Sequence, residues 1–255
     1  MYFDEFKNRP ILITGASTGI GAALARALGG LGARVAVHYN SSRDAAEQVG
    51  EDIAKAGGEA FLVAGDVSNS EANDEIVRRT VEAFGGLHTL INNAGGMLGR
   101  IPIVDVDDEH YERVMDLNAR SVLQACRAAI PAMRESGGGN IINTTSIAAR
   151  TGGGEGAGFY GASKAFVSTL TRVLAKEHAK ENIRVNGVAP GVIATPFHER
   201  YSNDDQLEGA RKTIPMGRLG TSEDCVGAFL FLGCDALSAY ITGQVIEVNG
   251  GQLMP

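Results

Sequence analysis

Tyr160 and Lys164 are the residues of this chain whose types and spacing first suggest chemistry. On a helix, positions four apart lie on one face, so the phenol and the ammonium group would lie side by side. A phenol with its ordinary pKa near about 10 is a poor acid-base catalyst at neutral pH, and a nearby cation lowers that pKa. We therefore expect Lys164 to bring Tyr160 into the range where it exchanges protons with a substrate alcohol or carbonyl. The alternative is a surface helix that carries an unrelated tyrosine and lysine.

The composition is that of a soluble globular protein. The chain has 255 residues, of which 44% are hydrophobic and 21% charged, and no apolar run approaches the roughly 20 residues of a membrane span. A net charge of −7 argues against nucleic acid as a partner, because neutralising phosphates needs a basic face. The N-terminus lacks the apolar stretch of a signal peptide, and the three cysteines have no metal-type spacing. We expect a cytoplasmic protein with no membrane association and no metal.

Short apolar runs alternate with amphipathic helical stretches along the whole chain. The runs cover residues 11–13, 35–37, 60–63, 89–91, 141–142, 185–188 and 245–248. Runs this short and this apolar are typical of parallel strands that are covered on both faces. The alternation predicts an α/β fold with one open, doubly wound parallel sheet of seven strands, in a single domain over residues 1–255. A (β/α)8 barrel would need eight regular units. Residues 191–221 lack strand character and are expected to form a helical insertion or substrate lid.

A glycine-rich turn, Thr-Gly-Ala-Ser-Thr-Gly-Ile-Gly over residues 14–21, directly follows the first expected strand and opens a helix. Such a turn lets backbone N–H groups approach a pyrophosphate at the positive end of the helix. The spacing differs from the common Gly-x-Gly-x2-Gly pattern of dinucleotide-binding turns. Its predicted cofactor-binding residues are Gly15, Ser17, Thr18, Gly19, Ile20 and Gly21.

Two further strand ends are expected to face the cofactor. Asp66 and Val67 follow the third strand, where an acid could accept the adenine amino group; the alternative is an N-cap or turn residue. The fourth strand closes with Asn93, Ala94 and Gly95, whose small side chains and amide allow close approach of a ribose. The alternative there is a simple turn between strand and helix.

The end of the second strand indicates which dinucleotide is bound. An NAD site usually places an acid there to bind the ribose 2′-hydroxyl, and none is present in this chain. Hydroxyls and an arginine suit a 2′-phosphate instead. We therefore expect NADP(H) as cofactor, with NAD(H) as the alternative, and predict contacts from Asn40, Ser41, Ser42 and Arg43. Arg43 could also be a solvated residue in the first turn of the next helix.

The chain resembles the short-chain dehydrogenase/reductase family. The resemblance rests on the glycine turn, Asn92-Asn-Ala-Gly95, Ser146 and Tyr160-x3-Lys164 in this order, and it runs from about Pro10 to the C-terminus. It implies a Rossmann fold and nicotinamide-dependent interconversion of an alcohol and a ketone or aldehyde. It also implies a homotetramer that pairs through the helices carrying Asn118 and Tyr160.

The resemblance assigns roles to individual residues. Asn118 matches the catalytic asparagine of the family, which would hold a water. Tyr160 is the general acid/base, Ser146 hydrogen-bonds the substrate oxygen, and Lys164 lowers the pKa of Tyr160 and binds the nicotinamide ribose. The loop that contacts the nicotinamide in the family matches Pro190, Gly191, Ile193 and Thr195 here.

The substrate is left open by the sequence. Ser146 lies fourteen positions before Tyr160, one more than is common in the family, and the glycine-rich residues 152–158 between them are expected to form a wall of the pocket. The segment from Gly217 resembles those of 3-oxoacyl-carrier-protein reductases and of sugar dehydrogenases of the glucose 1-dehydrogenase type. A carrier protein would need a basic patch, for which Arg100, Arg120 and Arg127 are candidates. The substrate is thus a small-molecule carbonyl or alcohol compound. A cofactor-binding sensor without turnover is the alternative from another class.

Overall fold

One open sheet of seven parallel strands organises the computed structural model, which describes residues 2–254. The order across the sheet is β3-β2-β1-β4-β5-β6-β7, with β3 and β7 as the two edges. The strands are β1 (Pro10–Ile13), β2 (Arg34–Tyr39), β3 (Glu59–Ala64), β4 (Thr89–Asn92), β5 (Gly139–Thr144), β6 (Ile183–Pro190) and β7 (Val245–Val248). The predicted seven-stranded Rossmann sheet is confirmed, and the barrel is excluded because the sheet does not close.

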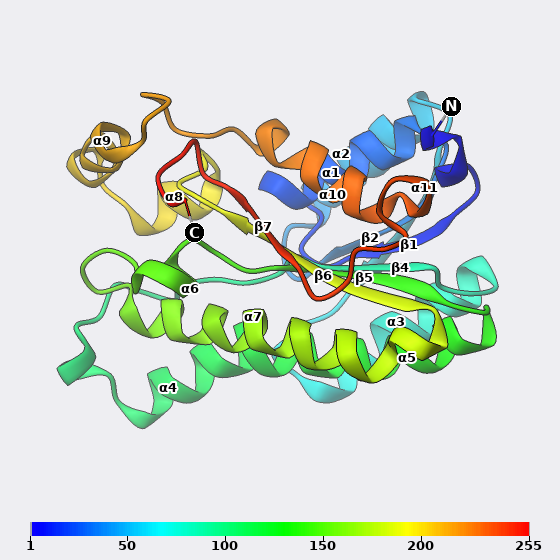
Figure 1. Ribbon diagram of the computed structural model, residues 1–255, viewed down its shortest axis with the longest axis horizontal. Coiled ribbons are helices and arrows are strands. Elements are labelled where there is room, and N and C mark those ends of the chain that lie inside the picture. Colours follow the sequence, from blue (N-terminus) through cyan, green and yellow to red (C-terminus); the bar gives the residue numbers. More distant parts are fainter. Residues whose placement is uncertain (1, 255) are drawn as a thin grey trace.

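Helices cover both faces of the sheet, as Figure 1 shows. One layer contains α1 (Gly19–Gly30), α2 (Arg43–Lys55), α10 (Ser222–Gly233) and α11 (Asp235–Ser238). The other layer contains α3 (Ser70–Phe84), α4 (Asp108–Met115), α5 (Ser121–Glu135) and α7 (Gly158–His178). This arrangement explains why the strand sequences are apolar on both faces rather than alternating with polar residues.

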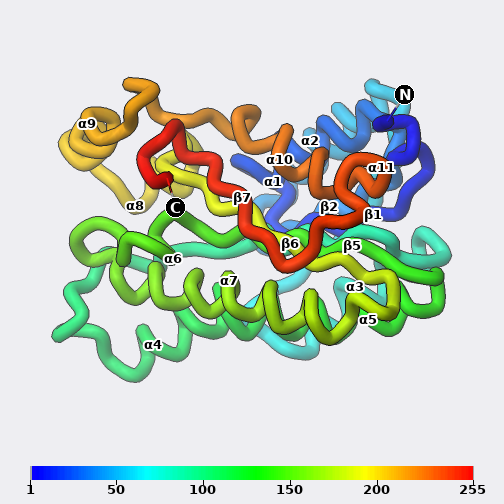
Figure 2. Tube along the Cα trace, in the orientation of Figure 1, coloured from blue at the N-terminus to red at the C-terminus, as the bar shows by residue number. Residues whose placement is uncertain are grey.

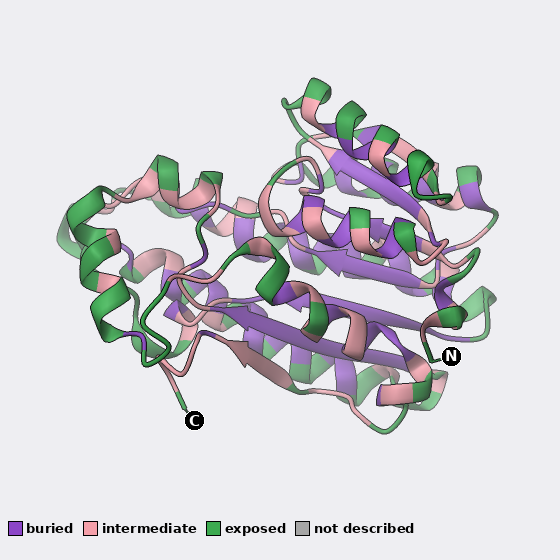
Figure 3. Cartoon of the chain, turned by 90° about the horizontal axis from the view of Figure 1, so that it is seen from above, coloured by how far each residue is buried: buried purple, intermediate pink, exposed green. Residues whose placement is uncertain are grey.

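Strand β1 shows how the two cores are divided. Ile11 and Ile13 point to one face and pack in the same cluster as Leu24 of α1, whereas Leu12 points to the opposite face and packs with Val122 of α5. Successive side chains of a strand point to opposite faces, so one short run supplies both cores. In Figure 3 the inner strands are accordingly buried, edge strand β7 is intermediate in burial, and the exposed residues gather on the outer sides of the helices.

The sheet changes direction at β1. This strand pairs with β2 on one side and with β4 on the other, so the chain connections on the two sides run in opposite directions. The loops that follow β1 and β4 therefore diverge at the carboxyl edge of the sheet. Open α/β sheets bind their ligands in the crevice at such a point.

The segment over residues 191–221 leaves the sheet after β6 and returns at α10. It forms α8 (Pro196–Tyr201) and α9 (Asp204–Thr213), which lie outside the two helix layers, as the yellow and orange part of the tube in Figure 2 shows. Its predicted helical character is confirmed. Helix α9 begins at a capping box in which Asn203 accepts a hydrogen bond from the Gln206 N–H at 2.9 Å. Among residues 2–254, no helix has both the length and the apolar character that a membrane span requires.

Candidate active site

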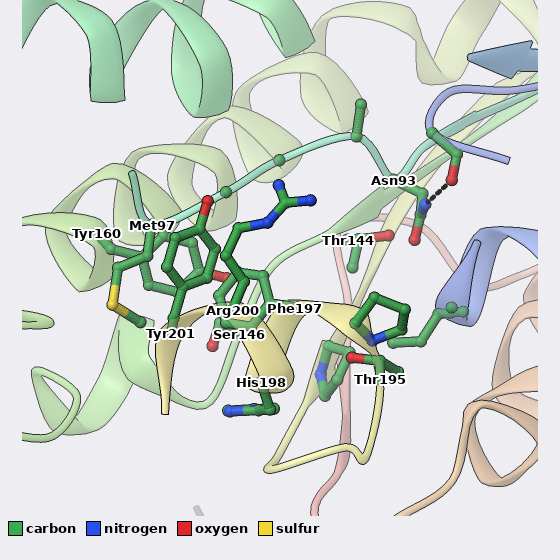
Figure 4. Close-up of a pocket in the computed structure, with 18 of the residues that line it drawn as sticks. Asn93, Met97, Thr144, Ser146, Tyr160, Thr195, Phe197, His198, Arg200 and Tyr201 are labelled. Carbon is green, nitrogen blue, oxygen red and sulfur yellow. Dashed lines mark hydrogen bonds between the residues drawn. The ribbon is translucent and has the colours of Figure 1, made fainter. Parts of the chain in front are cut away.

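A cavity of about 520 Å³ opens at the carboxyl edge of the sheet, between the strand ends and α8. Figure 4 shows side chains from the glycine turn, from the loops after β4 and β5, and from α8 converging on it. The structure brings nearly all of the predicted site residues to its wall. The exceptions are Gly21, Arg43 and Asn118.

The glycine turn after β1 needs glycine for its backbone shape and for close packing. Gly15 and Gly19 have φ angles of 63° and 56°, in the left-handed region that side chains disfavour. A Cβ atom on Gly21 would lie 2.6 Å from Nδ2 of Asn93. That amide donates hydrogen bonds to the carbonyl oxygens of Thr14 at 3.1 Å and Gly15 at 3.0 Å. Gly21 and Asn93 thus fix the turn on which the other residues of the loop depend.

His38 is a residue of this site that sequence reasoning missed. It is buried in β2, where Nδ1 accepts a hydrogen bond from the Gly15 N–H at 2.9 Å and Nε2 lies 3.0 Å from the Gly65 carbonyl oxygen. Because Nδ1 must accept, the ring proton belongs on Nε2, which donates to Gly65. Burial lowers the pKa of His38 and keeps the ring neutral. The sequence feature that could have identified His38 is its position as a single histidine in an apolar strand beside the glycine turn.

The end of β2 contributes Asn40, Ser41 and Ser42 to the cavity wall. Ser42 precedes α2 but makes no capping hydrogen bond with its side chain, so its hydroxyl is not committed to the helix. Arg43 lies outside the wall. Its guanidinium Nε donates to Glu47 Oε1 at 2.7 Å on the exposed side of α2. In this structure Arg43 is therefore a solvated residue of the first helical turn, which was the alternative to a cofactor contact.

Asp66 combines the two roles considered for it. One carboxylate oxygen, Oδ1, accepts hydrogen bonds from the N–H of Ser68 at 2.9 Å and from its hydroxyl at 2.8 Å, which is a turn role. Asp66 and Val67 also line the same end of the cavity as the β2 residues. The turn therefore holds the Asp66 carboxylate at the cavity wall, and the turn role and the cofactor role are compatible.

Ser146, Tyr160 and Lys164 meet at the other end of the cavity. Ser146 Oγ accepts a hydrogen bond from the Ala148 N–H at 3.1 Å and hydrogen-bonds to the phenol of Tyr160. Lys164 is buried, and its Nζ donates to the Thr144 carbonyl oxygen at 2.9 Å. The same Nζ lies 5.9 Å from the centre of the Tyr160 ring.

The expectation that Lys164 lowers the pKa of Tyr160 is wrong for the protein without its cofactor. Burial raises the pKa of Tyr160 to about 12, although the hydrogen bond from Ser146 acts to lower it. Burial also lowers the pKa of Lys164 to about 8. The physical reason is that desolvation penalises both charged forms, and the ammonium group is directed at the Thr144 carbonyl rather than at the phenol oxygen.

Asn118 is buried in a π-helical turn, Asp116–Arg120, between α4 and α5. Its Nδ2 donates to the carbonyl oxygens of Gly96 at 2.8 Å and Val114 at 3.0 Å, and its Oδ1 accepts from the Gly96 N–H at 3.1 Å. Both amide protons are thus used within the protein, and the side chain holds the loop after β4 in place. Such single π turns are frequent at functional sites.

The loop between Ser146 and Tyr160 forms one wall of the cavity, as expected from its glycine content. Gly153, Gly154 and Ala157 line it, and Gly152, Gly153 and Gly156 have φ angles of 81°, 76° and 70°. The loop after β6 lines the opposite wall with Pro190, Gly191, Ile193 and Thr195. Both predicted loops therefore reach the cavity.

Helix α8 covers the Tyr160 end of the cavity with aromatic side chains. The Phe197 ring centre lies 5.6 Å from that of Tyr160 and 5.0 Å from that of Tyr201. Burial, with the nearby Arg100, lowers the pKa of His198 to about 4, so this ring is neutral. Met97, Leu98 and Phe197 also line the cavity and were missed, because isolated apolar residues in loops carry no periodic signal.

Of the three arginines considered for a basic patch, Arg100 alone lines the cavity. Its Nε donates to the Tyr201 carbonyl oxygen at 2.6 Å, Nη1 to the Glu155 carbonyl oxygen at 2.9 Å, and Nη2 to Ser202 Oγ at 3.2 Å. Arg100 thus joins the loop after β4, the glycine-rich loop and α8. Arg120 pairs with Asp116 at 2.7 Å, and Arg127 lies on the exposed side of α5.

A nicotinamide dinucleotide fits the residues of this cavity. Thr18, the N-cap of helix α1, makes no side-chain capping bond, and the first turn of the helix carries no acid, so its N-terminal N–H groups can bind a pyrophosphate. A Cβ atom on Gly95 would lie 2.8 Å from Asn118 Oδ1 and 3.1 Å from Lys164 Nζ, in space that glycine leaves open. The hydroxyl oxygens of Thr144 and Thr145, which line the cavity, are buried with no protein partner.

The family model described as enoyl-(acyl carrier protein) reductase matches residues 15–252. The chain is 38% identical to a 3-oxoacyl-[acyl-carrier-protein] reductase of Synechocystis over 243 residues, 95% of this chain and 96% of the relative. It is 36% identical to 3beta-hydroxysteroid dehydrogenase 1 of Eggerthella lenta, over 99% of this chain and 96% of that protein. Among solved structures, the NADH-dependent reductase A1-R′ responsible for alginate metabolism, complexed with NAD, matches with a TM-score of 0.87 and 42% identity, covering 99% of this chain and 100% of that one.

Proposed function

Because the chain belongs to the short-chain dehydrogenase/reductase family, we propose that it reduces a small-molecule carbonyl compound with NADPH at the cavity around Tyr160. The observation that carries the proposal is the meeting of Ser146, Tyr160 and Lys164 beside a glycine turn built for a dinucleotide. A sensor without turnover would have no need for this constellation.

The bound dinucleotide would supply the hydride that attacks the carbonyl carbon. Tyr160, whose pKa is raised to about 12, keeps its proton at neutral pH and can give it to the developing alkoxide. The Ser146 hydroxyl, whose oxygen accepts from the Ala148 N–H, would turn its proton from the Tyr160 phenol to the substrate oxygen. That hydrogen bond strengthens as negative charge grows on the substrate oxygen. In oxidation the roles reverse, and Tyr160 accepts the proton.

Lys164 and Asn118 act behind these two residues. The Thr144 carbonyl orients Lys164 Nζ toward the space above Gly95, where a ribose hydroxyl could accept from it. With a pKa of about 8, this ammonium exchanges protons near neutral pH and can restore the proton that Tyr160 gives away. Asn118 holds Gly96, and with it the floor on which that ribose would rest.

The proposed preference for NADPH rests on the end of β2. Asn40, Ser41 and Ser42 face the cavity, and no acid stands among them to repel a 2′-phosphate. Arg43 would reach such a phosphate after leaving Glu47, an exposed ion pair of the kind that contributes less than about 1 kcal/mol. The ratio of kcat/KM for NADPH and NADH tests the preference, and a clear advantage of NADH would refute it.

The substrate candidates are best compared in one assay. Oxidation of NADPH would be followed by absorbance with 3-oxoacyl thioesters, simple ketones and aldehydes, and sugars, using the wild-type protein and Tyr160→Phe. The variant keeps the ring and removes the proton, so we expect a loss of about 100-fold or more in kcat with little change in cofactor affinity. Tyr111→Phe, at an exposed tyrosine of α4, is the matched control. Turnover by Tyr160→Phe within a few-fold of wild type would refute the mechanism.

We also propose a cytoplasmic homotetramer that pairs through α5 and α7. Leu123, Phe166 and Val173 expose 41%, 41% and 42% of their surface on these two helices, so a second copy could cover them. The three cysteines are free and buried, which suits a reducing compartment. Sedimentation would test the assembly, with Phe166→Arg expected to shift it toward smaller species.

A further inference from the structure

The Tyr160 end of the cavity has an unusual balance of charge for an acidic protein. The chain carries a net charge of −7, yet among the residues that line the cavity Asp66 is the one acid, whereas Arg100, Lys164 and Arg200 are cations. Asp66 belongs to the opposite end, beside Ser41 and Ser42. The half of the cavity that receives the substrate is therefore positive.

Two of these cations already have their partners. Lys164 is directed at the Thr144 carbonyl beside the reacting centre. Arg100 uses Nε, Nη1 and Nη2 on two carbonyl oxygens and a hydroxyl, none of which carries charge. The charge of Arg100 is thus not neutralised, and it contributes to lowering the pKa of the neighbouring His198.

Arg200 is the cation that remains available. Within the part of the chain that the structure describes, its guanidinium forms no hydrogen bond or ion pair, and its Cζ lies over the Tyr201 ring, 5.9 Å from the ring centre. Figure 4 shows the side chain extending from α8 across the cavity toward the loop between Asn93 and Met97. All five of its N–H donors are free for a ligand.

The position of Arg200 relates it to the reacting carbonyl. Arg200 and Phe197 lie three residues apart in α8 and so share one face of the helix. The Phe197 ring packs against Tyr160, which sets that face over the proton donor. A substrate whose carbonyl oxygen reaches Tyr160 would extend its next few atoms along this face, within reach of the guanidinium.

From this arrangement we infer that the substrate is a carbonyl compound that bears a carboxylate, and that Arg200 binds that carboxylate. A guanidinium matches a carboxylate with two parallel hydrogen bonds, which fixes orientation as well as adding affinity. The inference rests on the proposed reductase function and adds the substrate class. An arginine facing a cavity could also bind a cofactor phosphate, and the test separates the two sources.

The experiment compares aldehyde and keto acids with their methyl esters, which keep the carbonyl and lose the charge. With NADPH in excess, we expect the wild-type protein to prefer the acid by about tenfold or more in kcat/KM. Arg200→Gln should reduce this acid-to-ester ratio to near one, mainly through KM. Arg113→Gln is the control, because it removes an exposed arginine that lies on α4, outside the cavity. Affinity for NADPH, read from its fluorescence, should be the same in all three proteins.

Each other outcome has a definite meaning. Esters reduced as well as the acids by the wild-type protein would overturn the substrate class and leave the reductase function standing. A weakening of NADPH affinity in Arg200→Gln by about tenfold, at an unchanged acid-to-ester ratio, would overturn the inference in favour of a cofactor phosphate. If neither acids nor esters nor the broader carbonyl panel are turned over, the proposed function itself fails.

Discussion

Nδ1 of His38 accepts a hydrogen bond from the Gly15 N–H at 2.9 Å and so ties the glycine turn to the neighbouring strand β2. The other ring nitrogen, Nε2, bonds the Gly65 carbonyl, one residue before Asp66. One neutral imidazole therefore sets the distance between the turn that would hold the pyrophosphate and the acid at the adenine end.

Replacing His38 tests this link. In His38→Leu, Gly15 N–H and Gly65 C=O lose their partners, so we expect a loss of about 1–3 kcal/mol in unfolding free energy and weaker cofactor binding. The dissociation constant for NADPH, measured by fluorescence, should rise by about tenfold. His110→Leu, on α4, is the control and should bind the cofactor like wild type. Cofactor affinity unchanged in His38→Leu would show that the turn holds its shape unaided.

The pH dependence of cofactor binding should reflect the same imidazole. The folded pKa of His38 is lowered, so its stabilising contribution is present above the ordinary value of about 6.5 and is lost as pH falls through the lowered folded value. Protonated Nδ1 could no longer accept from Gly15. We expect affinity for NADPH to decline in the wild type as pH falls below the ordinary histidine value of about 6.5, and this decline to be absent in His38→Leu. The two proteins would be compared by titration at several pH values.

Lys164 should produce a break on the alkaline side. Because its pKa is lowered to about 8, its ammonium form disappears as pH rises through that value, while Tyr160, with a pKa of about 12, keeps its proton. We expect kcat/KM for NADPH in the reductive direction to be flat near neutral pH and to fall above about pH 8. A kcat/KM for the wild-type protein that stays flat as pH rises through about 8 would contradict this assignment.

The same lysine should reduce the stability of the fold. Its pKa falls from 10.5 to about 8, which corresponds to about 3 kcal/mol against folding at neutral pH. Lys164→Met removes that penalty. It also leaves the Thr144 carbonyl without its donor, which destabilises the variant by roughly 1–3 kcal/mol. We expect an inactive protein whose Tm at pH 7 is higher by about 2–4 °C. Between about pH 8 and 10.5 the unfolded chain binds more protons than the folded one, so the stability of the wild-type protein should rise with pH across that window. The difference in Tm between Lys164→Met and wild type should therefore become smaller as pH rises. A lower Tm in the variant would contradict this reading.

Arg100 should matter for substrate affinity more than for the chemical step. In Arg100→Met, Tyr201, Ser202 and Glu155 lose the group that joins their loops, so α8 should cover the cavity less firmly. We expect KM for the carbonyl substrate to rise by about tenfold with a smaller change in kcat. Hydrogen exchange should increase in α8 and in residues 152–158, but not in β1. Exchange unchanged in both segments would show that their own packing holds them.

How far the sequence leads can be judged from particular residues. The glycine turn and Tyr160-x3-Lys164 are local patterns, and their placement between strand and helix follows from the apolar periodicity around them. Both could therefore be predicted, together with the seven strands. The rest depends on contacts between distant segments, which no local pattern records. His38 and Gly15 are 23 residues apart, and Arg100 and Tyr201 are 101 apart.

The direction of the Tyr160 pKa is the clearest example of that limit. Spacing alone places a cation beside the phenol and argues for a lower pKa. Burial of Tyr160 in the assembled fold, where the Phe197 ring of α8 lies 5.6 Å away between ring centres, raises the pKa of the phenol more than the hydrogen bond from Ser146 lowers it. The burial of a side chain is a property of the assembled fold, so the sign of the shift could not be read from the helix that carries it.

The three hydrogen bonds of Arg100 set a practical rule for engineering this protein. A chimaera in which α8 alone is exchanged would lose the hydrogen bonds from Arg100 to Tyr201 and Ser202. The loop after β4, residues 152–158 and α8 therefore form one exchangeable cassette, although they are scattered along the chain. Libraries that diversify all three together should yield active variants with altered selectivity more often than libraries confined to any one of them.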